Sequence, residues 1–301
     1  MNEKVIALGF FDGVHIGHGA LLRKTVERAK ETGLTPSVFT FDRSPKEVVT
    51  GKPVPLINSA EDRRELIGRL FGITDVTMAP FDQRMMTMPW QEFITRLLIK
   101  EQRAAHLVAG HDYHFGYKNE GTPELLRQTC QRLGLGCDII PKVTIDGVTV
   151  SSTHIRELVQ NGDLEEATAF LGHPHTLTQI VRHGKRIGRT IGIPTVNLIA
   201  PRHVLVPGHG VYITRVFLPD GTGYAAVTNV GTRPTVNNGT DVTVEAFLLD
   251  FDGDLYGEVL RVEFYKKVRG EMKFDSLEDL KAQISRDAAV TRAYFQEHAT
   301  V

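Results

Sequence analysis

The sequence has little of what marks secreted, membrane-bound or nucleic-acid-binding proteins. It contains only two cysteines, Cys130 and Cys137, whose separation fits neither a zinc pair nor a redox motif, so we expect reduced core residues. No apolar run approaches membrane-spanning length, and only four apolar residues follow residues 1–4, too few for a signal peptide. A net charge of -1 argues against non-specific binding to nucleic acid or to a membrane surface. These absences predict a globular protein in the cytoplasm.

The first half of the sequence alternates short apolar runs with helical patterns. Runs typical of buried strands lie at residues 5–8, 37–41, 76–79, 107–109 and 137–140. Helical patterns lie between them at residues 20–32, 59–71, 89–103 and 122–133, and Ser59 and Gly33 are predicted helix caps. This alternation predicts an α/β domain with a parallel sheet covered on both faces. Such sheets bind ligands beyond the carboxyl ends of their strands.

The second half has a different pattern, in which helical periodicity disappears after residue 174. Alternating apolar segments lie at residues 177–182, 211–218, 224–230, 242–249 and 259–264, with turns between them. They predict an antiparallel sheet curled into a small barrel. Ser276 then caps a final helix expected to bury Leu277, Leu280 and Ile284. The sequence therefore predicts an α/β domain at residues 1–174 and a β-barrel domain with a terminal helix at residues 175–301.

Residues 9–18 directly follow the first predicted strand and open a helix. A helix N-terminus has unpaired N–H groups and a partial positive charge, so it attracts phosphate. His15 and His18 can turn both imidazoles to one side, where they would donate to phosphate oxygens and stabilise charge during displacement. Gly13 and Gly17 would let backbone or a flat base come close. A strand–helix turn with two exposed histidines is the alternative interpretation.

Two later segments are predicted at the same edge of the sheet. Ser152, Thr153 and Arg156 lie at a strand-to-helix junction. One interpretation is an ordinary helix cap. In the other, the hydroxyls hold a phosphate and the Arg156 guanidinium clamps a transferring phosphoryl group. The loop at residues 110–116 follows a strand, and with His106 it suggests zinc only weakly, because its histidines lack cysteine or paired carboxylates.

Residues 9–18, 110–116 and 151–156 together resemble the adenylyltransferase module of bacterial FAD synthetases, a Rossmann-like nucleotidyltransferase domain. The resemblance implies in-line attack of the FMN phosphate on the α-phosphorus of ATP, with release of pyrophosphate. It gives catalytic roles on the ATP phosphates to His15, His18 and Arg156. The other nucleotide and phosphate contacts that it implies are Gly9, Phe10, Asp12, Gly13, Gly17, Asp112, Ser152 and Thr153.

One segment departs from that family at two positions. Its members usually carry Pro-His-Pro after the second strand, where this chain has Arg43, Ser44 and Pro45. The histidine is absent and an arginine has been added. Two interpretations stay open, a weakened adenylylation or an arginine that supplies the lost positive charge.

The segment at residues 184–197 is the second dense cluster of glycines and cations. It is typical of a loop around a polyphosphate, without the spacing of a P-loop, although a hairpin turn with solvated charges is the alternative. Thr195 and Asn197 share a face of an extended segment, and such oxygens suit Mg²⁺. Glu245, which shares a strand face with Phe247, either accepts a proton from an attacking hydroxyl or is simply solvated.

Residues 188–197, 231–235, 251–257 and 269–274 resemble riboflavin kinase, and the match covers nearly all of residues 176–297. The resemblance implies a six-stranded barrel that transfers the γ-phosphate of Mg-ATP to the ribityl 5′-hydroxyl of riboflavin. It implies Mg²⁺ binding by Thr195 and Asn197, a catalytic base at Glu245, and a segment closing over flavin at Arg269 and Glu271. The nucleotide contacts predicted for this module are Gly184, Lys185, Gly188, Arg189, Gly192 and Pro194.

The sequence thus predicts a bifunctional transferase that uses ATP and Mg²⁺ to convert riboflavin to FMN and FMN to FAD. One alternative is a riboflavin kinase with a weakened or inactive adenylyltransferase domain, and another is a flavin-sensing protein without catalysis. A DNA- or RNA-binding regulator is disfavoured by the balanced charge. The oligomeric state, a homo-oligomer included, stays open. So does the role of Met85, Met86 and Met88, for which core filling is favoured over a flavin pocket.

Overall fold

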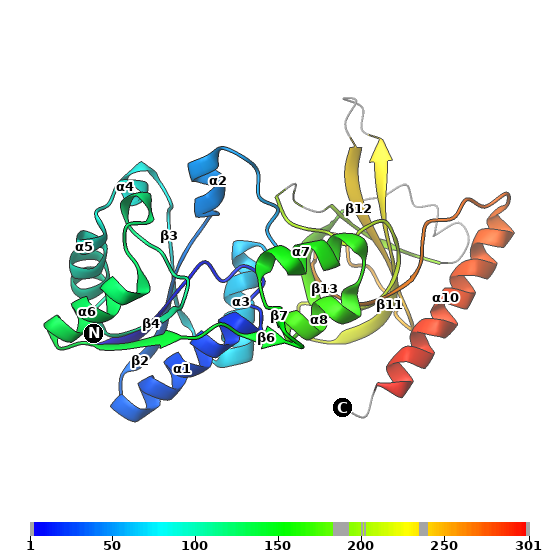
Figure 1. The fold of residues 1–301 in the computed structure, drawn as a ribbon. Coiled ribbons are helices and arrows are strands. Elements are labelled where there is room, and N and C mark those ends of the chain that lie inside the picture. The colour runs from blue at the N-terminus through cyan, green and yellow to red at the C-terminus, as the bar shows by residue number, and fades with distance from the viewer. Residues whose placement is uncertain (1–2, 183–192, 200, 202, 235–239, 299–301) are drawn as a thin grey trace. The chain divides into compact units, whose positions relative to one another are not determined.

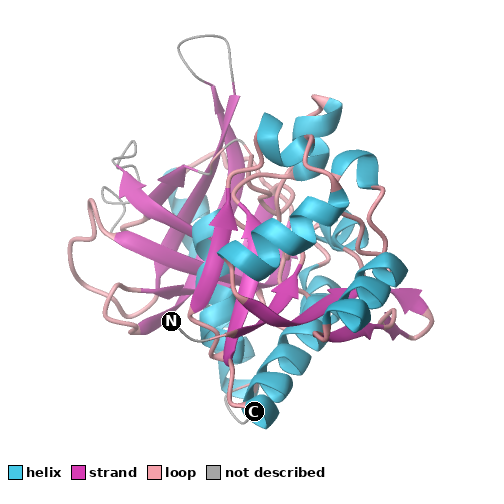
Figure 2. Cartoon of the chain, turned by 90° about the vertical axis from the view of Figure 1, so that its left-hand side faces the viewer, coloured by secondary structure: helices cyan, strands magenta, loops and turns pink. Residues whose placement is uncertain are grey.

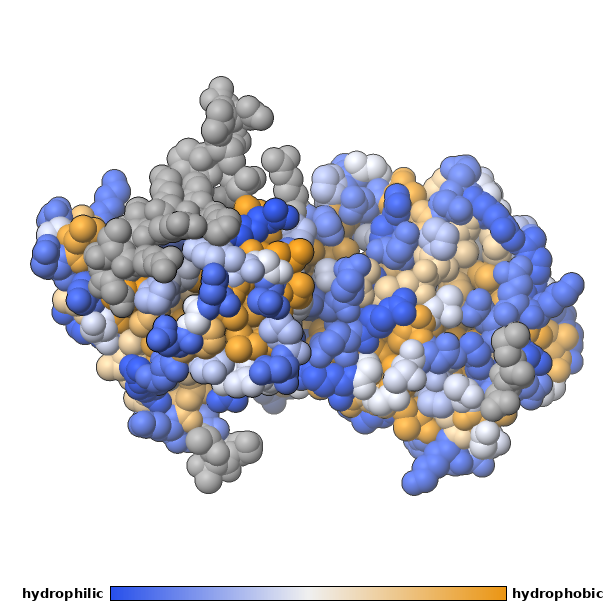
Figure 3. Space-filling model, turned by 180° about the vertical axis from the view of Figure 1, so that it is seen from behind, coloured by the Kyte–Doolittle hydropathy of each residue, from blue (hydrophilic) through white to orange (hydrophobic). Residues whose placement is uncertain are grey.

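The computed structural model describes residues 3–182, 193–199, 201, 203–234 and 240–298. The chain divides into two compact units, Met1–Ser152 and Thr153–Val301, and Figure 1 shows a sheet with helices in the first and a barrel in the second. The boundary at residue 174 stays a prediction about the functional domains. Among the helices in the described ranges, none combines the length and apolar character needed to cross a membrane. Polar and charged residues are spread over the face of each unit visible in Figure 3.

The first unit is built on a five-stranded parallel sheet in the order β3-β2-β1-β4-β5. Its strands, magenta in Figure 2, are β1 (Lys4–Leu8), β2 (Thr35–Phe41), β3 (Asp75–Ala79), β4 (Ala104–Gly110) and β5 (Gly136–Ile140). In β1, Ile6 and Leu8 belong to one buried cluster and Val5 and Ala7 to another. The sheet is therefore covered on both faces, and the predicted α/β class is confirmed.

The other elements of this unit connect and cover the strands. They are α1 (Ile16–Thr32), α2 (Pro45–Thr50), α3 (Ala60–Phe71), α4 (Gln83–Met86), α5 (Trp90–Glu92), η1 (Phe93–Glu101), η2 (Tyr117–Asn119), α6 (Pro123–Leu133), and the hairpin β6 (Thr144–Ile145) and β7 (Val148–Thr149). The predicted caps are confirmed: Ser59 accepts the N–H of Asp62 at the start of α3, and Gly33 ends α1 with φ +70°. The single helix predicted over residues 89–103 is instead α5 followed by wider π-helical turns in η1.

Strand order decides where a ligand can enter this unit. The order reverses between β1 and β4, and the carboxyl ends of two parallel strands at such a reversal flank the usual ligand crevice. The chain leaves β1 into residues 9–15 and leaves β4 into residues 111–116. Two of the segments singled out in the sequence therefore leave the sheet at this crevice.

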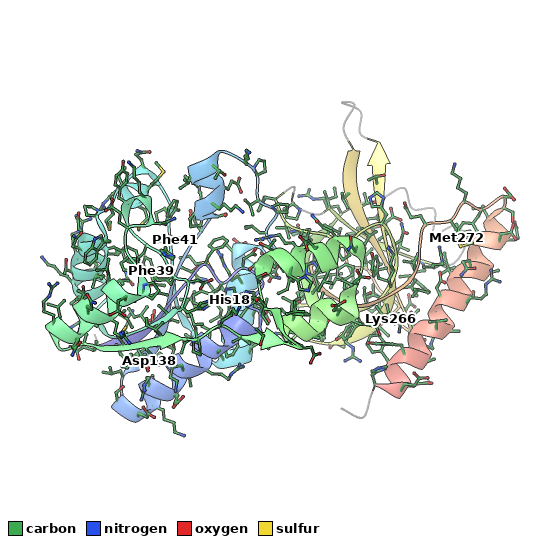
Figure 4. The ribbon with its side chains drawn as sticks, in the orientation of Figure 1. His18, Phe39, Phe41, Asp138, Lys266 and Met272 are labelled. Carbon is green, nitrogen blue, oxygen red and sulfur yellow. The ribbon has the colours of Figure 1, made fainter. Side chains whose placement is uncertain are left out.

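The second unit holds a closed barrel of antiparallel strands in the order β10-β11-β12-β9-β8-β13. The strands are β8 (His175–Arg182), β9 (Val196–Ile199), β10 (Gly210–Phe217), β11 (Gly223–Pro234), β12 (Thr240–Leu248) and β13 (Val259–Arg269). Helices α7 (Ser152–Asn161) and α8 (Leu164–Leu171) precede the barrel, and α8 packs against β8 and β13. Lys266 of β13, labelled in Figure 4, pairs with Glu165 of α8 at 3.0 Å. The predicted six-stranded barrel is confirmed, with β9 as a strand that the periodicity had not marked.

Side chains of the barrel alternate between its interior and its outer face. Val244 and Ala246 of β12 are 0% exposed and lie opposite Val230 and Thr228 of β11 in register. Phe247, which follows Ala246, points outward and packs in a cluster with Ala288 of the terminal helix. The outer face of β12 is therefore partly covered by that helix.

The terminal helix is α10 (Leu277–Glu297), capped by Ser276 as predicted. The predicted burial is wrong for Leu277, which is 52% exposed, whereas Leu280 and Ile284 are half-buried. The buried residues of α10 are Asp287, Ala288 and Thr291. Asp287 pairs with Arg269 of β13 at 2.8 Å, and a buried carboxylate needs its partner. Leu280 and Ile284 share the helix face of Asp287 by their spacing, and the ion pair anchors that face to β13.

His175 is a buried titratable group at the start of the barrel. It is 1% exposed, and its Nε2 lies 3.2 Å from the carbonyl oxygen of Leu205, to which it donates. Burial lowers the pKa of His175 to about 4, with a smaller lowering by His173 and a partial offset by the bond to Leu205. The imidazole is therefore neutral in the folded protein at neutral pH.

We expect this burial to make the barrel unit acid-sensitive. Below an unfolded pKa of about 6.5 the unfolded chain binds a proton that folded His175 does not, so the free energy of unfolding falls by roughly 3 kcal/mol as pH drops to about 4. Melting temperature measured from pH 7 to pH 4.5 should fall less steeply for His175→Gln, which keeps a donor toward Leu205. The exposed His203→Gln is the matched control and should follow the wild type. An unchanged slope in His175→Gln would contradict the assignment.

Candidate functional sites

The loop between β1 and α1 has a strained backbone. Phe11, Gly13 and Val14 have φ of +57°, +85° and +43°, a region that is unfavourable for bulky and β-branched side chains. Phe11 and Val14 are nevertheless 0% and 1% exposed, and the N–H of Val14 donates to the carbonyl of Phe11 at 3.0 Å. Such a conformation persists only where surrounding contacts hold it.

This loop presents His15 and His18 as a stacked pair. His15 caps α1 by accepting the backbone N–H of His18 on Nδ1 at 3.2 Å, and the ring centroids are 3.5 Å apart. Because Nδ1 accepts, neutral His15 carries its proton on Nε2 and can donate there. Burial lowers the pKa of His18 well below 6.5, with further lowering by the charges of His15 and Arg63. The pair therefore consists of an N–H donor and a neutral imidazole at a helix N-terminus.

Gly17 makes room for this pair. A Cβ at Gly17 would lie 3.2 Å from Cε1 and Nδ1 of the His15 ring, closer than most side-chain carbons come to a neighbour. The glycine between the two histidines therefore lets the His15 imidazole lie against the helix.

Asp12 and Gly9 help to shape the loop itself. The Asp12 carboxylate is 2% exposed and accepts the backbone N–H groups of Ile57 at 2.9 Å and Asn58 at 3.4 Å. A Cβ at Gly9 would lie 3.0 Å from the Phe11 ring. In this structure the carboxylate anchors residues 57–58 against the loop.

The start of α7 is tied to the same loop. The hydroxyl of Ser152 donates to the carbonyl of Asp12 at 3.0 Å. Near the start of α7, Thr153 is exposed and Arg156 is half-buried. The structure thus joins Ser152 to residues 9–18, as expected for segments at one edge of the sheet.

Asp112 lies on the loop that follows β4. Its side chain is 81% exposed, and its carbonyl bonds Nδ1 of His114 at 2.9 Å. His106 does not belong to this loop, because it lies in β4 and pairs with Asp138 of β5 at 2.8 Å. Figure 4 shows Asp138 below His18 and beside α1. Within the described residues no three His, Cys, Asp or Glu side chains come together as a metal site.

At the departure from the family pattern, Ser44 is a helix cap. Its Oγ accepts the N–H of Glu47 at 3.4 Å at the start of α2, and it is 4% exposed. The Arg43 side chain is 66% exposed, with Nε 3.7 Å from Asp42. The serine therefore builds local structure, and the arginine holds a solvent-exposed charge just after β2.

The methionines before η1 are mainly core residues. Met88 is 4% exposed in the cluster that includes Phe39 and Phe93, and Met85 packs against it. Phe39 and Phe41 of β2, labelled in Figure 4, meet edge-to-face. Met88 thus has the favoured core-filling role.

The barrel carries a row of polar residues across three strands. Glu245 of β12 lies opposite Asn197 of β9 on one side and Asn229 of β11 on the other. Residues opposite one another in antiparallel strands share a face. Since Val244 and Ala246 point into the barrel, this row lies on its outer face, and the predicted orientation of Glu245 is confirmed.

Sequence reasoning missed Asn229, which is half-buried within β11. Its only signal is a polar residue inside a strand of apolar and hydroxyl residues. Thr195 is half-buried and Pro194 exposed just before β9. The predicted contacts that lie outside the described residues are Gly184, Lys185, Gly188, Arg189 and Gly192.

Glu271 lies beside this row, whereas Arg269 is held by α10. A Cβ at Gly231 would lie 2.5 Å from Oε1 of Glu271 and 3.3 Å from Nδ2 of Asn229, so the glycine leaves room for both side chains. The Arg269 guanidinium donates to both carboxylate oxygens of Asp287 at 2.8–3.3 Å. Of the two predicted flavin contacts, Glu271 therefore lies beside the polar row, whereas Arg269 is engaged by Asp287 of α10.

Comparison with known proteins identifies both units. The FAD synthetase family profile matches residues 1–154 and the riboflavin kinase profile residues 171–295. The bifunctional riboflavin kinase/FMN adenylyltransferase of Listeria monocytogenes is 35% identical, covering 97% of this chain and 93% of the relative. That of Escherichia coli K12 is 36% identical, covering 97% and 92%.

A crystal structure described as a macrolide-efflux protein from Streptococcus pneumoniae is also similar. It has a TM-score of 0.84 at 33% identity and covers 97% of this chain and 94% of that one. Matches of this length and identity to bifunctional relatives, with both profiles in one chain, show that the chain belongs to the family of bifunctional riboflavin kinases/FMN adenylyltransferases.

Proposed function

We propose that the two reactions of this family are divided between two sites of the chain. Residues 1–174 adenylylate FMN at the β1–α1 loop, and residues 175–301 phosphorylate riboflavin at the row formed by Asn197, Glu245 and Asn229. The observation that carries the first assignment is the stacked pair of His15 and His18 at the start of α1.

In FMN adenylylation, a phosphate oxygen of FMN attacks the α-phosphorus of ATP. The bond from that phosphorus to the bridging oxygen breaks, and pyrophosphate leaves. His15 donates from Nε2 to a phosphate oxygen, and the N-terminus of α1 adds its own partial charge. His18 orders His15 through its backbone N–H and packs against its ring. Arg156 supplies positive charge for the phosphates.

In riboflavin phosphorylation, the ribityl 5′-hydroxyl oxygen attacks the γ-phosphorus of ATP and ADP leaves. Glu245 accepts the hydroxyl proton. Its position between Asn197 and Asn229, with Glu271 beside the row, supports this role because neighbouring polar groups can orient both carboxylate and substrate.

Thr195 and Asn197 are the candidate ligands for Mg²⁺ in the barrel. They offer a hydroxyl and an amide oxygen two positions apart, which are hard oxygen donors of the kind that Mg²⁺ prefers. A bound divalent cation would neutralise charge on the ATP phosphates.

A flavin time course tests the assignment of two activities to one chain. Riboflavin, ATP and Mg²⁺ should yield FMN first and FAD later, and FMN with ATP should yield FAD and pyrophosphate, with chelation of Mg²⁺ stopping FMN formation. Flavins are separated by chromatography. FMN without FAD would leave only the kinase, and unchanged riboflavin would point to flavin binding without catalysis.

The cytoplasm is the proposed compartment. Cys130 and Cys137 form no disulfide. A hydrogen bond between the two thiols lowers the pKa of Cys130 and raises that of Cys137. Free neighbouring thiols are typical of a reducing compartment.

A further inference from the structure

Arg63 is the largest fully buried side chain among the described residues, at 0% exposure in α3. A buried guanidinium is unfavourable unless its N–H groups are hydrogen-bonded. Its environment lowers its pKa to about 10, chiefly through burial, with partial offset by Asp12, Asp42 and Glu61. It remains charged at neutral pH.

The partners of Arg63 are two backbone carbonyls at the ligand edge of the sheet. Nη1 donates to the carbonyl of Phe10 at 2.7 Å and Nη2 to that of Phe41 at 2.6 Å. Phe10 lies in the loop after β1, and Phe41, labelled in Figure 4, ends β2. The guanidinium also lies 4.4 Å from the centroid of the Phe10 ring. Arg63 therefore links the loop after β1 to the end of β2.

The linked carbonyl directly precedes the strained part of the loop. Phe11 follows Phe10 and has φ +57°. The Phe10 carbonyl also accepts the hydroxyl of Thr40 at 3.0 Å, so two side chains hold one oxygen. A strained backbone needs such anchors to keep its conformation.

Arg63 also acts on His18 through its charge. Together with burial and His15, it lowers the pKa of His18. The charged groups that surround Arg63 itself are Asp12, Asp42 and Glu61. One side chain thus influences both the backbone that carries the histidine pair and the protonation of one member.

We propose that Arg63 is a positioning residue for FMN adenylylation, which holds the β1–α1 loop so that His15 and His18 meet the ATP phosphates. This inference rests on the proposed phosphate site at that histidine pair.

The test compares Arg63→Lys and Arg63→Met with Arg64→Lys, an exposed neighbour on α3. Lysine keeps the charge and can reach one carbonyl but not both. We expect kcat for FAD formation from FMN to fall on the order of 10-fold in Arg63→Lys, and further in Arg63→Met, because small displacements of reacting groups slow catalysis strongly. The KM for ATP should change less than kcat. FMN formation from riboflavin, measured on the same protein, and the Arg64→Lys control should stay at wild-type rates.

A second readout separates positioning from stability. The His18 imidazole resonance, followed by NMR against pH, should titrate at higher pH in Arg63→Met and stay near the wild-type midpoint in Arg63→Lys. A wild-type kcat for FAD formation in Arg63→Lys would overturn the proposal. So would a loss of FAD formation matched by an equal loss of helical circular dichroism, because Arg63 would then hold only the fold.

The outcome for His18→Asn distinguishes this proposal from the one on which it rests. If His18→Asn forms FAD normally, the phosphate site itself is misplaced. If His18→Asn fails to form FAD while Arg63→Lys succeeds, only the role of Arg63 is wrong.

Discussion

Glu245→Gln is expected to abolish riboflavin phosphorylation and to leave FMN adenylylation intact. Glutamine keeps the size of the side chain and its place between Asn197 and Asn229, but it cannot accept the hydroxyl proton. Loss of a general base should lower kcat for FMN formation on the order of 1,000-fold. Chromatography of flavins after incubation with riboflavin and ATP measures this loss, and incubation with FMN and ATP measures the retained activity.

The matched control for this change is Glu258→Gln, an exposed glutamate beside the start of β13. It makes the same chemical change in the same unit and should phosphorylate riboflavin at the wild-type rate. If Glu245→Gln forms FMN as fast as the control, Glu245 is not the base, and the polar row on the barrel has another role.

His18→Asn should have the reverse effect, with FAD formation lost and FMN formation kept. Asparagine keeps the backbone N–H that donates to Nδ1 of His15 but removes the ring stacked on His15 at 3.5 Å. Loss of a preorganised group at the transferring phosphates should lower kcat for FAD formation on the order of 100-fold. Pyrophosphate release from ATP and FMN, followed over time, measures this rate.

His298→Asn is the control for that prediction, since it removes an exposed histidine at the end of α10. Both variants should phosphorylate riboflavin normally, which shows that the chain is folded. Equal rates of pyrophosphate release in the two variants would remove His18 from the adenylylation site.

The sequence predicts the elements of this protein well where local chemistry decides them. Ser59 caps α3 and Gly33 ends α1 because a hydroxyl and a left-handed glycine satisfy helix ends within a few residues. Two-residue alternation likewise placed Glu245 on the strand face of Phe247, opposite the buried Val244 and Ala246. It did not mark β9, because that short strand is defined by its pairing with β8 and β12.

The start of α10 shows where local pattern fails. The leucine spacing predicted burial of Leu277, which is 52% exposed. Further along the helix the pattern holds, since Leu280 and Ile284 are half-buried on the face of Asp287. Asp287 anchors that face through Arg269, which comes from another element. An unpaired buried carboxylate is far more unfavourable than an exposed leucine, so the helix docks where this pair is kept.

The sequence by itself determined which residues are proposed to bring the chemistry, since His15, His18 and Glu245 lie in recognisable segments. Only the tertiary structure decided what surrounds them. Arg63 contacts a carbonyl 53 residues away, and Asn229 meets Glu245 through strand register. A hydrogen bond to a backbone carbonyl leaves no pattern in the partner's side chain, and register is set by the closed barrel as a whole, so neither contact can be found by reading the residues in order.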